Sequence, residues 1–185
     1  MYDQLERELK ILISESTFEK ILNSYAFKKP VIQTNVYYDD DQGTVRKLGA
    51  IRIRTIGDKN IFTFKIRKDP ITQIELEKAV DAKTLNEIDD PEVLEWLASY
   101  GIPENLQPFA TSKTQRYVCE FDKGELCLDK TQFGDVTDYE AEYEYKIDHD
   151  GLQVFNDILK PFGIHYEKNA PSKLARALEY SKTCE

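Results

Sequence analysis

The chain has 185 residues, of which 25 are lysine or arginine and 34 are aspartate or glutamate, so its formal net charge is −9. Hydrophobic residues make up 41% and charged residues 32%, which excludes a disordered chain and predicts one globular domain over residues 1–185. The negative charge also excludes a long nucleic acid held on the surface, because such binding needs a basic face.

Hydrophobic periodicity predicts mostly strands. Residues 4–13 alternate apolar and charged side chains and predict the first strand, after which Ser16 can cap a helix through about Tyr25. The turns Gly57-Asp58-Lys59 and Lys123-Gly124 predict two hairpins. The further predicted strands are Val31–Asp39, Ala50–Ile56, Asn60–Lys68, Thr72–Val80, Thr111–Asp122, Glu125–Thr131 and Asp135–Ile147. The further predicted helices are Asp81–Glu87, Pro91–Tyr100, Gly151–Phe162 and Ser172–Ser181.

The predicted strands outnumber the predicted helices, and short turns join many of them. This pattern indicates an α+β fold made mainly of antiparallel strands, either a barrel or a strongly curved sheet, with helices on the periphery. An acidic linker, Ile88-Asp89-Asp90-Pro91, lies in the middle of the chain. Because strands are predicted on both sides of it, one fold is favoured over two small domains.

Cysteine usage and hydropathy predict the compartment. Cys119, Cys127 and Cys184 form no CxxC motif; Cys119 and Cys127 can face each other across the second hairpin, and a reduced pair is favoured over a disulfide. The first eight residues contain no apolar segment of a signal peptide, and no stretch approaches the ~18 apolar residues of a membrane-spanning helix. We therefore expect a cytoplasmic protein with no membrane partner, and leave the oligomeric state open.

Several common catalytic motifs are absent from the sequence, among them GxGxxG, GxxxxGK[ST], GxSxG and HExxH. His149 and His165 are isolated. The acidic run 39–43 lacks the closing acid of a calcium loop because Ala50 stands at that position, so it predicts a polar turn. Trp96 has the helical spacing of a core residue. None of these features carries a function.

Like charges two residues apart recur on the predicted strands, and therefore share one face of each strand. They are Glu6/Glu8 followed by Lys10, Arg52/Arg54, Glu75/Glu77, and Glu140/Glu142 followed by Glu144, while Lys65 and Arg116 stand singly. A sheet with one solvated face is the simplest interpretation of any one strand, but a solvated face more naturally mixes signs. Carboxylates supply hard ligands for Mg²⁺ or Mn²⁺, and arginines bind phosphate through paired N–H groups. The segregated pairs therefore indicate a metal–polyphosphate site, with charged faces inward and helices covering the outside.

In order and spacing, these residues resemble the CYTH superfamily of triphosphate tunnel metalloenzymes. Glu6-x-Glu8-x-Lys10 is similar to the ExExK signature of that family, and Arg52-x-Arg54 is similar to its RxR strand. The resemblance extends to Tyr37-Tyr38-Asp39, Lys65, Glu75-x-Glu77, Arg116, Asp129, Glu140-x-Glu142 and Ala170-Pro171-Ser172-Lys173-Leu174. It spans nearly the whole chain and implies an eight-stranded antiparallel β-barrel tunnel with peripheral helices.

The resemblance implies a divalent-metal-dependent triphosphatase that acts on inorganic, nucleoside or thiamine triphosphate. It implies catalytic roles for Glu6, Glu8 and Lys65, and a metal site for Mg²⁺ or Mn²⁺ made by Glu6, Glu8, Asp129, Glu140 and Glu142. The triphosphate would be held by Lys10, Arg52, Arg54, Lys65, Arg116 and Lys173. Glu75 and Glu77 would either hold a second metal or orient Arg52 and Arg54. Lys113 and Lys168 are expected on the surface, and Tyr37 and Tyr38 in the core rather than at the tunnel mouth.

Three alternatives use the same residues. The chain can be a class IV adenylate cyclase, in which a ribose hydroxyl rather than water attacks the phosphate. It can also be a non-catalytic module that binds polyphosphate or nucleotide, or a structural domain with solvated charged stripes. The proposed tunnel set contains six basic and seven acidic residues, so most of the net charge lies outside it. A small polyanion is therefore compatible with an acidic chain.

Overall fold

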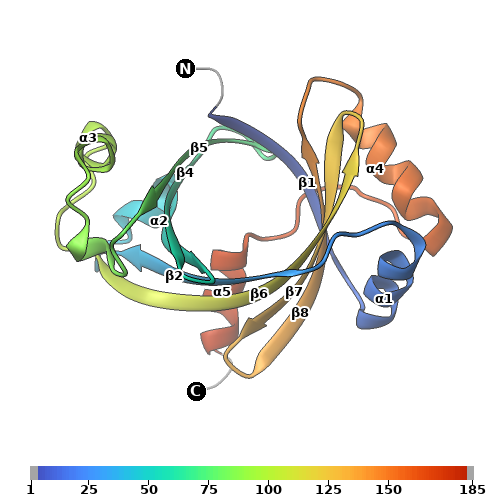
Figure 1. The fold of residues 1–185 in the computed structure, drawn as a ribbon, viewed down its shortest axis with the longest axis horizontal. Helices are drawn as coiled ribbons and strands as arrows, with labels where there is room; N and C mark the ends of the chain where they lie inside the picture. Colours follow the sequence, from blue (N-terminus) through green and yellow to red (C-terminus); the bar gives the residue numbers. More distant parts are fainter. Residues whose placement is uncertain (1–3, 183–185) are drawn as a thin grey trace.

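The computed structural model describes residues 4–182, and in this part of the chain eight strands close into an antiparallel barrel (Figure 1). The strands are β1 (Leu5–Ile13), β2 (Val31–Asp39), β3 (Gly49–Ile56), β4 (Lys59–Arg67), β5 (Thr72–Val80), β6 (Gln107–Phe121), β7 (Gly124–Phe133) and β8 (Val136–Tyr145). Their order around the barrel is β1-β5-β4-β3-β2-β6-β7-β8. The predicted fold class and its strand-rich character are confirmed.

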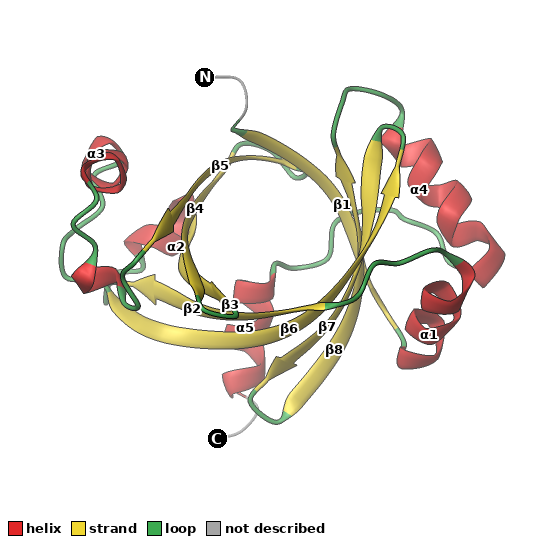
Figure 2. Cartoon of the chain, viewed as in Figure 1, coloured by secondary structure: helices red, strands yellow, loops and turns green. Residues whose placement is uncertain are grey.

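Five α-helices occur in the same part of the chain, and they lie outside the strands (Figure 2). They are α1 (Glu15–Ser24), α2 (Thr44–Leu48), α3 (Pro91–Ser99), α4 (Gly151–Leu159) and α5 (Lys173–Lys182). Helices α1 and α4 lie together on one side, and α3 lies on the opposite side. Within residues 4–182, no helix has both the length and the apolar character needed to cross a membrane.

Two apolar cores lie between the barrel and these helices. Under α1 and α4, Phe18 and Phe155 pack against outward-facing strand residues such as Leu128. Near α3, Val93 belongs to the same cluster as the barrel residues Ile53, Phe62 and Phe64. Burial of these apolar surfaces is the main favourable contribution to folding. Because strand side chains alternate, packing the apolar faces outward leaves the charged faces inside the barrel.

Strand register then brings charged side chains side by side within the barrel, most of them of opposite sign. Arg116 of β6 lies opposite Asp129 of β7, which in turn lies opposite Glu140 of β8. Lys10 of β1 lies opposite Glu142, and Lys65 of β4 lies opposite Glu75 of β5. Residues that are far apart in the sequence therefore meet as cross-strand pairs.

Two predicted helix boundaries are wrong. Helix α1 begins at Glu15 because Ser14 is the cap, and its Oγ accepts a hydrogen bond from the Thr17 backbone N–H at 3.1 Å. Ser16 therefore lies inside the first turn and does not cap the helix. The predicted helix over Asp81–Glu87 shrinks to one 3₁₀ turn, Leu85–Glu87, which a Thr84/Glu87 capping box closes.

The short helix α2 was not predicted. It follows the acidic run that ends β2, and its N–H groups find an acceptor there: the Asp39 carboxylate accepts from the backbone of Val45 at 2.9 Å and of Arg46 at 3.3 Å. Arg46 also forms a 2.7 Å ion pair with Asp39. The polar turn predicted over residues 39–43 is thus the start of a helical turn that packs outside β2 and β3.

The second hairpin does not bring its cysteines together. Cys127 lies opposite Val118, and Cys119 lies opposite Leu126, so the two side chains point to opposite faces of the sheet. Both are buried and free of a disulfide within residues 4–182. The predicted facing arrangement is wrong, and Cys184 lies outside the described residues.

Gly49 allows β3 and β4 to approach each other next to the charged cavity. A Cβ atom at this position would lie 1.9 Å from the Lys65 backbone oxygen. Gly49→Ala should therefore lower the free energy of unfolding by about 1–3 kcal/mol, since overpacking forces the backbone apart. Urea denaturation measures this difference.

Gly57→Asn is the matched control, because Gly57 has φ +61 and open space around it, a conformation that asparagine tolerates. This variant should change the free energy of unfolding by less than about 1 kcal/mol. Equal effects of the two substitutions would contradict the close approach at Gly49.

Candidate functional site

A cavity of about 740 Å³ lies inside the barrel and opens between the strands and the segment that leads into α5. Most of the predicted site residues line it: Glu6, Glu8, Lys10, Arg52, Arg54, Lys65, Glu75, Glu77, Arg116, Glu142 and Lys173. Asp129 and Glu140 belong to the same wall and are fully buried beside Glu142. The structure therefore collects the charged stripes of separate strands around one space.

Three carboxylates converge on the C-terminal helix. Asp129, Glu140 and Glu142 each offer an oxygen atom, and these oxygens lie within 4.8 Å of one another. The Lys173 ammonium, at the start of α5, contacts all three: Asp129 Oδ2 at 2.8 Å, Glu142 Oε1 at 2.7 Å, and Glu140 Oε1. An ammonium group held by three buried acids marks a point that strongly favours a cation.

Arg116 completes this cluster from β6. Its guanidinium donates to both oxygens of Asp129, at 2.8 Å and 2.6 Å, and also to Glu142. Burial raises the pKa of Glu140 to about 7, with Lys173 opposing this effect and Glu142 adding to it. Burial also favours a neutral Glu142, but Lys173 and Arg116 outweigh it and hold the pKa of Glu142 well below its usual range.

The acids of β1 are paired with a different set of lysines. Lys65 Nζ donates to Glu6 at 2.6 Å and forms a 2.9 Å ion pair with Glu75, while Lys10 Nζ donates to Glu8 at 2.5 Å. Burial lowers the pKa of Lys65, but the surrounding carboxylates outweigh this and raise it. Among residues 4–182, the three-acid cluster includes neither Glu6 nor Glu8. The five acids expected to hold metal thus form two groups.

Within residues 4–182, the arginine pair of β3 has no such carboxylate partner. Arg54 Nε donates to the amide oxygen of Asn35 at 3.1 Å, and Arg52 is only 8% exposed, yet no atom of residues 4–182 accepts from its buried Nε. Burial, together with the charges of Arg52 and Arg116, lowers the pKa of Arg54 to about 10. Two cationic side chains therefore face the cavity with donor groups that an anion can satisfy.

The three-acid cluster has the chemistry of a divalent metal site. Mg²⁺ and Mn²⁺ prefer hard oxygen ligands, and carboxylates supply them. Asp129 and Glu140 are fully buried and Glu142 is 5% exposed, so their negative charge is screened little by water. The oxygens already converge on one cationic atom, Lys173 Nζ, which fits the requirement of a bound cation.

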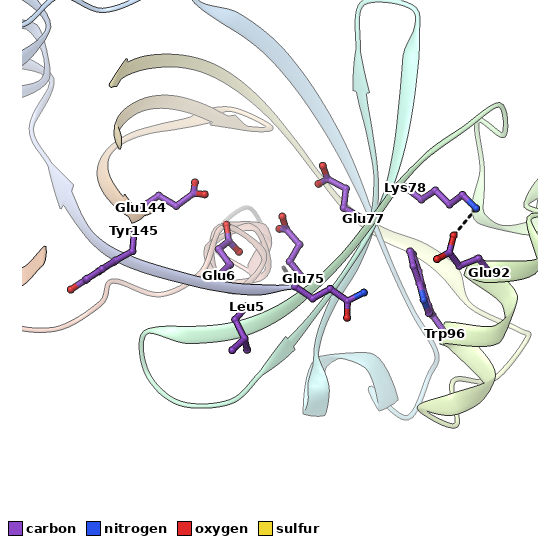
Figure 3. A pocket seen from close by; sticks show the side chains of 10 residues that line it. Leu5, Glu6, Glu75, Glu77, Lys78, Glu92, Trp96, Glu144 and Tyr145 are labelled. Carbon is purple, nitrogen blue, oxygen red and sulfur yellow. Dashed lines mark hydrogen bonds and ion pairs between the residues drawn. The ribbon is translucent and has the colours of Figure 1, made fainter. Parts of the chain in front are cut away.

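A second pocket, of about 410 Å³, adjoins the cavity at the end where β1 begins (Figure 3). The carboxylates of Glu6, Glu75, Glu77 and Glu144 contribute to it, and α3 contributes Glu92 and Trp96. Lys78 fastens α3 to β5 through ion pairs with Asp90 at 2.9 Å and Glu92 at 2.8 Å. Trp96 packs against the core near α3, as expected, and also lines this second, acidic pocket.

The remaining predicted positions behave differently from one another. Lys113 and Lys168 are exposed, as expected, although Lys168 also borders the cavity. Tyr38 lies in the core, which confirms that prediction, but Tyr37 lines the cavity on the inward face of β2. Burial opposes ionisation of Tyr37, but the positive charge of Arg52, a hydrogen bond with Ser112 and the charges of Lys173 and Arg54 together outweigh it and lower the pKa of the phenol.

Sequence reasoning missed three polar side chains that contact the predicted site. They are Asn35 on β2, Gln73 on β5 and Arg176 on α5. Gln73 donates to Glu6 at 2.6 Å and stands two residues before Glu75, so strand alternation gave a signal for it. Arg176 stands three residues after Lys173 on a predicted helix, a spacing that places both on neighbouring faces.

Comparisons with known proteins agree with this geometry. The CYTH domain model matches residues 4–178. YjbK of Bacillus subtilis (strain 168), which is named as a candidate triphosphatase, is 27% identical over 197 aligned positions, and the match covers 97% of each chain. The chain therefore belongs to the CYTH family, as the sequence resemblance predicted.

Solved structures share the fold. A crystal structure of a candidate adenylate cyclase from Bacillus halodurans is 25% identical, with a TM-score of 0.82, and the match covers 94% of this chain and 98% of that one. A Hippeastrum protein, described as a candidate adenylyl cyclase with a dominant triphosphatase activity, is 22% identical, with a TM-score of 0.77 and 95% of each chain covered.

Glu144, which lines the second pocket, is expected to make the free energy of unfolding depend on pH. Burial and the neighbouring Glu6 raise the pKa of Glu144. The folded state therefore binds a proton at Glu144 more readily than the unfolded state, whose glutamate pKa is about 4.3, so the ionised carboxylate destabilises the fold as the pH rises above that value. Glu144→Gln should raise the free energy of unfolding at pH 8, and the gain should shrink towards pH 5.

Urea denaturation at both pH values measures the gain, with Glu120→Gln as the control. A hydrogen bond from Lys28 lowers the pKa of Glu120, so its ionised form favours folding and its loss should not stabilise the protein. A Glu144→Gln variant that is less stable than the wild type at pH 8 would contradict the account.

Proposed function

We propose that this chain hydrolyses a compact triphosphate with the help of a bound divalent cation. The substrate would be inorganic triphosphate, or a nucleoside or thiamine triphosphate. One observation carries the proposal. Arg52 and Arg54 donate no hydrogen bond to a carboxylate within residues 4–182, and they face the same cavity as a buried three-acid cluster. A polyanion and a cation can therefore both be bound in one space.

The basic side chains would bind the substrate. Lys10, Arg52, Arg54, Lys65, Arg116 and Lys173 line the cavity, and we assign the triphosphate to them. Arginine presents planar, paired donors that match phosphate oxygens, and lysine supplies a compact point charge. Lys65 and Lys173 are bound to carboxylates in the free protein, so they are already oriented before a phosphate arrives.

The acids would hold the cation. We assign Asp129, Glu140 and Glu142 to Mg²⁺ or Mn²⁺, with Glu6 and Glu8 of β1 as further ligands. When bound, such a cation neutralises phosphate charge and polarises the phosphoryl group. The 2.9 Å contact of Glu75 with Lys65 supports a positioning role for Glu75, and Glu77 would act beside it as a second positioning acid.

Catalysis would come from position and electrostatics rather than from a nucleophilic side chain. Phosphoryl transfer requires the phosphates to be aligned and their charge stabilised. Glu6 and Lys65, joined at 2.6 Å, would act together with Glu8 on the reacting phosphate. Water would be the attacking group. Residues 1–185 would act as one domain, in the cytoplasm.

A class IV adenylate cyclase is the second candidate function. The similarity to the B. halodurans protein, itself a candidate cyclase, favours it, whereas YjbK favours the triphosphatase. In the cyclase a ribose hydroxyl attacks, so the products differ. Purified protein should be incubated with inorganic triphosphate, thiamine triphosphate or ATP, each with Mg²⁺ or Mn²⁺, and assayed for phosphate and cyclic AMP.

Phosphate release supports the triphosphatase, and cyclic AMP without phosphate release supports the cyclase. Tight triphosphate binding without turnover would leave a binding module. The absence of both triphosphate binding and turnover would contradict every function proposed for the cavity, and a structural domain would remain.

Replacement of one cavity arginine tests the binding role. Arg52→Met removes a guanidinium that would bind phosphate, and a hydrogen bond to a charged group contributes about 1.5–3 kcal/mol. We therefore expect KM for inorganic triphosphate to rise about ten- to hundredfold. Lys113→Met removes an exposed lysine from β6 and should leave KM unchanged. Equal KM values for the two variants would contradict the assignment of Arg52.

A further inference from the structure

Arg176 is almost completely buried, at 1% exposure, although it lies on the peripheral helix α5. It is not part of the cavity lining, which at α5 includes Lys173, Leu174 and Ala175. Its guanidinium instead reaches the back of the three-acid cluster. Nη1 donates to Glu140 Oε2 at 2.7 Å, and Nε donates to Asp138 Oδ2 at 2.8 Å.

We infer that Arg176 is a positioning residue for the bound cation: it holds Glu140 Oε2 so that Oε1 faces the tunnel as the single ligand atom of that carboxylate. The inference rests on the proposed function, because it takes Asp129, Glu140 and Glu142 as the metal ligands. It adds a residue on α5 that contacts neither the cation nor the triphosphate.

The two oxygens of Glu140 have separate partners. Oε2 accepts from Arg176, and Oε1 contacts the Lys173 ammonium together with Asp129 Oδ2 and Glu142 Oε1. Oε1 therefore faces the point where the cluster converges, and Oε2 faces away from it. A fully buried carboxylate without this second partner is able to rotate and to offer either or both oxygens.

Asp138 fixes Arg176 in turn. It lies two residues before Glu140 on β8, and its Oδ2 accepts from Arg176 Nε and, at 3.0 Å, from the Tyr180 hydroxyl. Arg176 Nη1 also donates to the Pro171 backbone oxygen at 2.6 Å, just before α5 begins. Two of the three guanidinium nitrogens, Nε and Nη1, are thus held by three acceptors, and a fork with several fixed donors is a geometry that lysine does not reproduce.

Arginine also suits the state with a cation bound. A divalent ion at the point now taken by Lys173 would compete with that ammonium for Glu140 Oε1. Arg176 lies on the other oxygen and does not compete. Partners of metal ligands typically alter metal affinity 10–100-fold when they are replaced, which gives the expected size of the effect.

The test is Mn²⁺ binding by isothermal titration calorimetry to wild type, Arg176→Met, Arg176→Lys and the control Lys182→Met. Lys182 is an exposed residue of the same helix. We expect Arg176→Met to bind Mn²⁺ about 10–100-fold more weakly than wild type, Arg176→Lys to recover part of this loss, and Lys182→Met to match wild type. Circular dichroism and urea denaturation establish that each variant is folded.

Enzyme kinetics give a second readout that a purely structural role would not produce. The Mn²⁺ concentration for half-maximal triphosphate hydrolysis should rise with Arg176→Met, while KM for triphosphate at saturating Mn²⁺ stays unchanged, because Arg176 does not line the cavity. A folded Arg176→Met variant with wild-type Mn²⁺ affinity would overturn the inference.

If Arg176→Met does not fold, Asp138→Asn replaces it, since it loosens Arg176 without opening a cavity. Weaker Mn²⁺ binding by Asp138→Asn then supports the inference, and unchanged binding overturns it. A wild-type protein that binds no Mn²⁺ would instead remove the metal from the proposed function, and the inference with it.

Discussion

A charge that a closed barrel turns inward needs a partner there, because an unpaired ion away from water costs several kcal/mol. The interior of this barrel meets that constraint on one wall through Lys173 and Arg116, which bind the carboxylates of Asp129, Glu140 and Glu142. These ion pairs join β6, β7 and β8 to the C-terminal helix. They complement the outward packing of the apolar faces, because strand side chains alternate between the two faces of the sheet.

On the opposite wall, the inward-facing arginines of β3 lack such carboxylate partners among residues 4–182. This difference between the two walls creates the candidate site. Arg52 and Arg54 face the cavity without a hydrogen-bonded carboxylate among residues 4–182. The acids across the cavity are held by lysine and arginine, which a divalent cation can supplement or replace. A metal-bound triphosphate would supply negative charge to the arginines and positive charge to the acids. An acidic chain with a net charge of −9 is therefore able to bind a polyanion internally.

Strand alternation and turn signals predicted an antiparallel barrel or strongly curved sheet with its charged faces inward, because these signals are local properties that tertiary packing did not override. The closed eight-stranded tunnel and the set of residues that meet inside it were implied by the family resemblance. Neither source predicted which acids share a cluster. Glu6-x-Glu8 and Glu140-x-Glu142 are equivalent motifs, but Glu6 and Glu8 pair with Lys65 and Lys10, whereas Glu140 pairs with Lys173 and Arg176 of α5. Helix α2 depends on hydrogen bonds to the side chain of Asp39. Whether Ser14 or Ser16 caps α1 depends on which of the two has an extended backbone, and in the structure this is Ser14, with ψ 158. Arg176 was missed because its partners, Asp138 and Glu140, are 38 and 36 residues away in the chain.

The most direct measurement is a crystal structure of the protein grown with Mn²⁺ and inorganic triphosphate, with anomalous diffraction recorded at the manganese edge. The account predicts an anomalous peak among the oxygens of Asp129, Glu140 and Glu142, and phosphate density beside Arg52 and Arg54 inside the barrel. Manganese or phosphate bound only on the outer surface, with Lys173 still bound to all three acids and the cavity holding water alone, would contradict it.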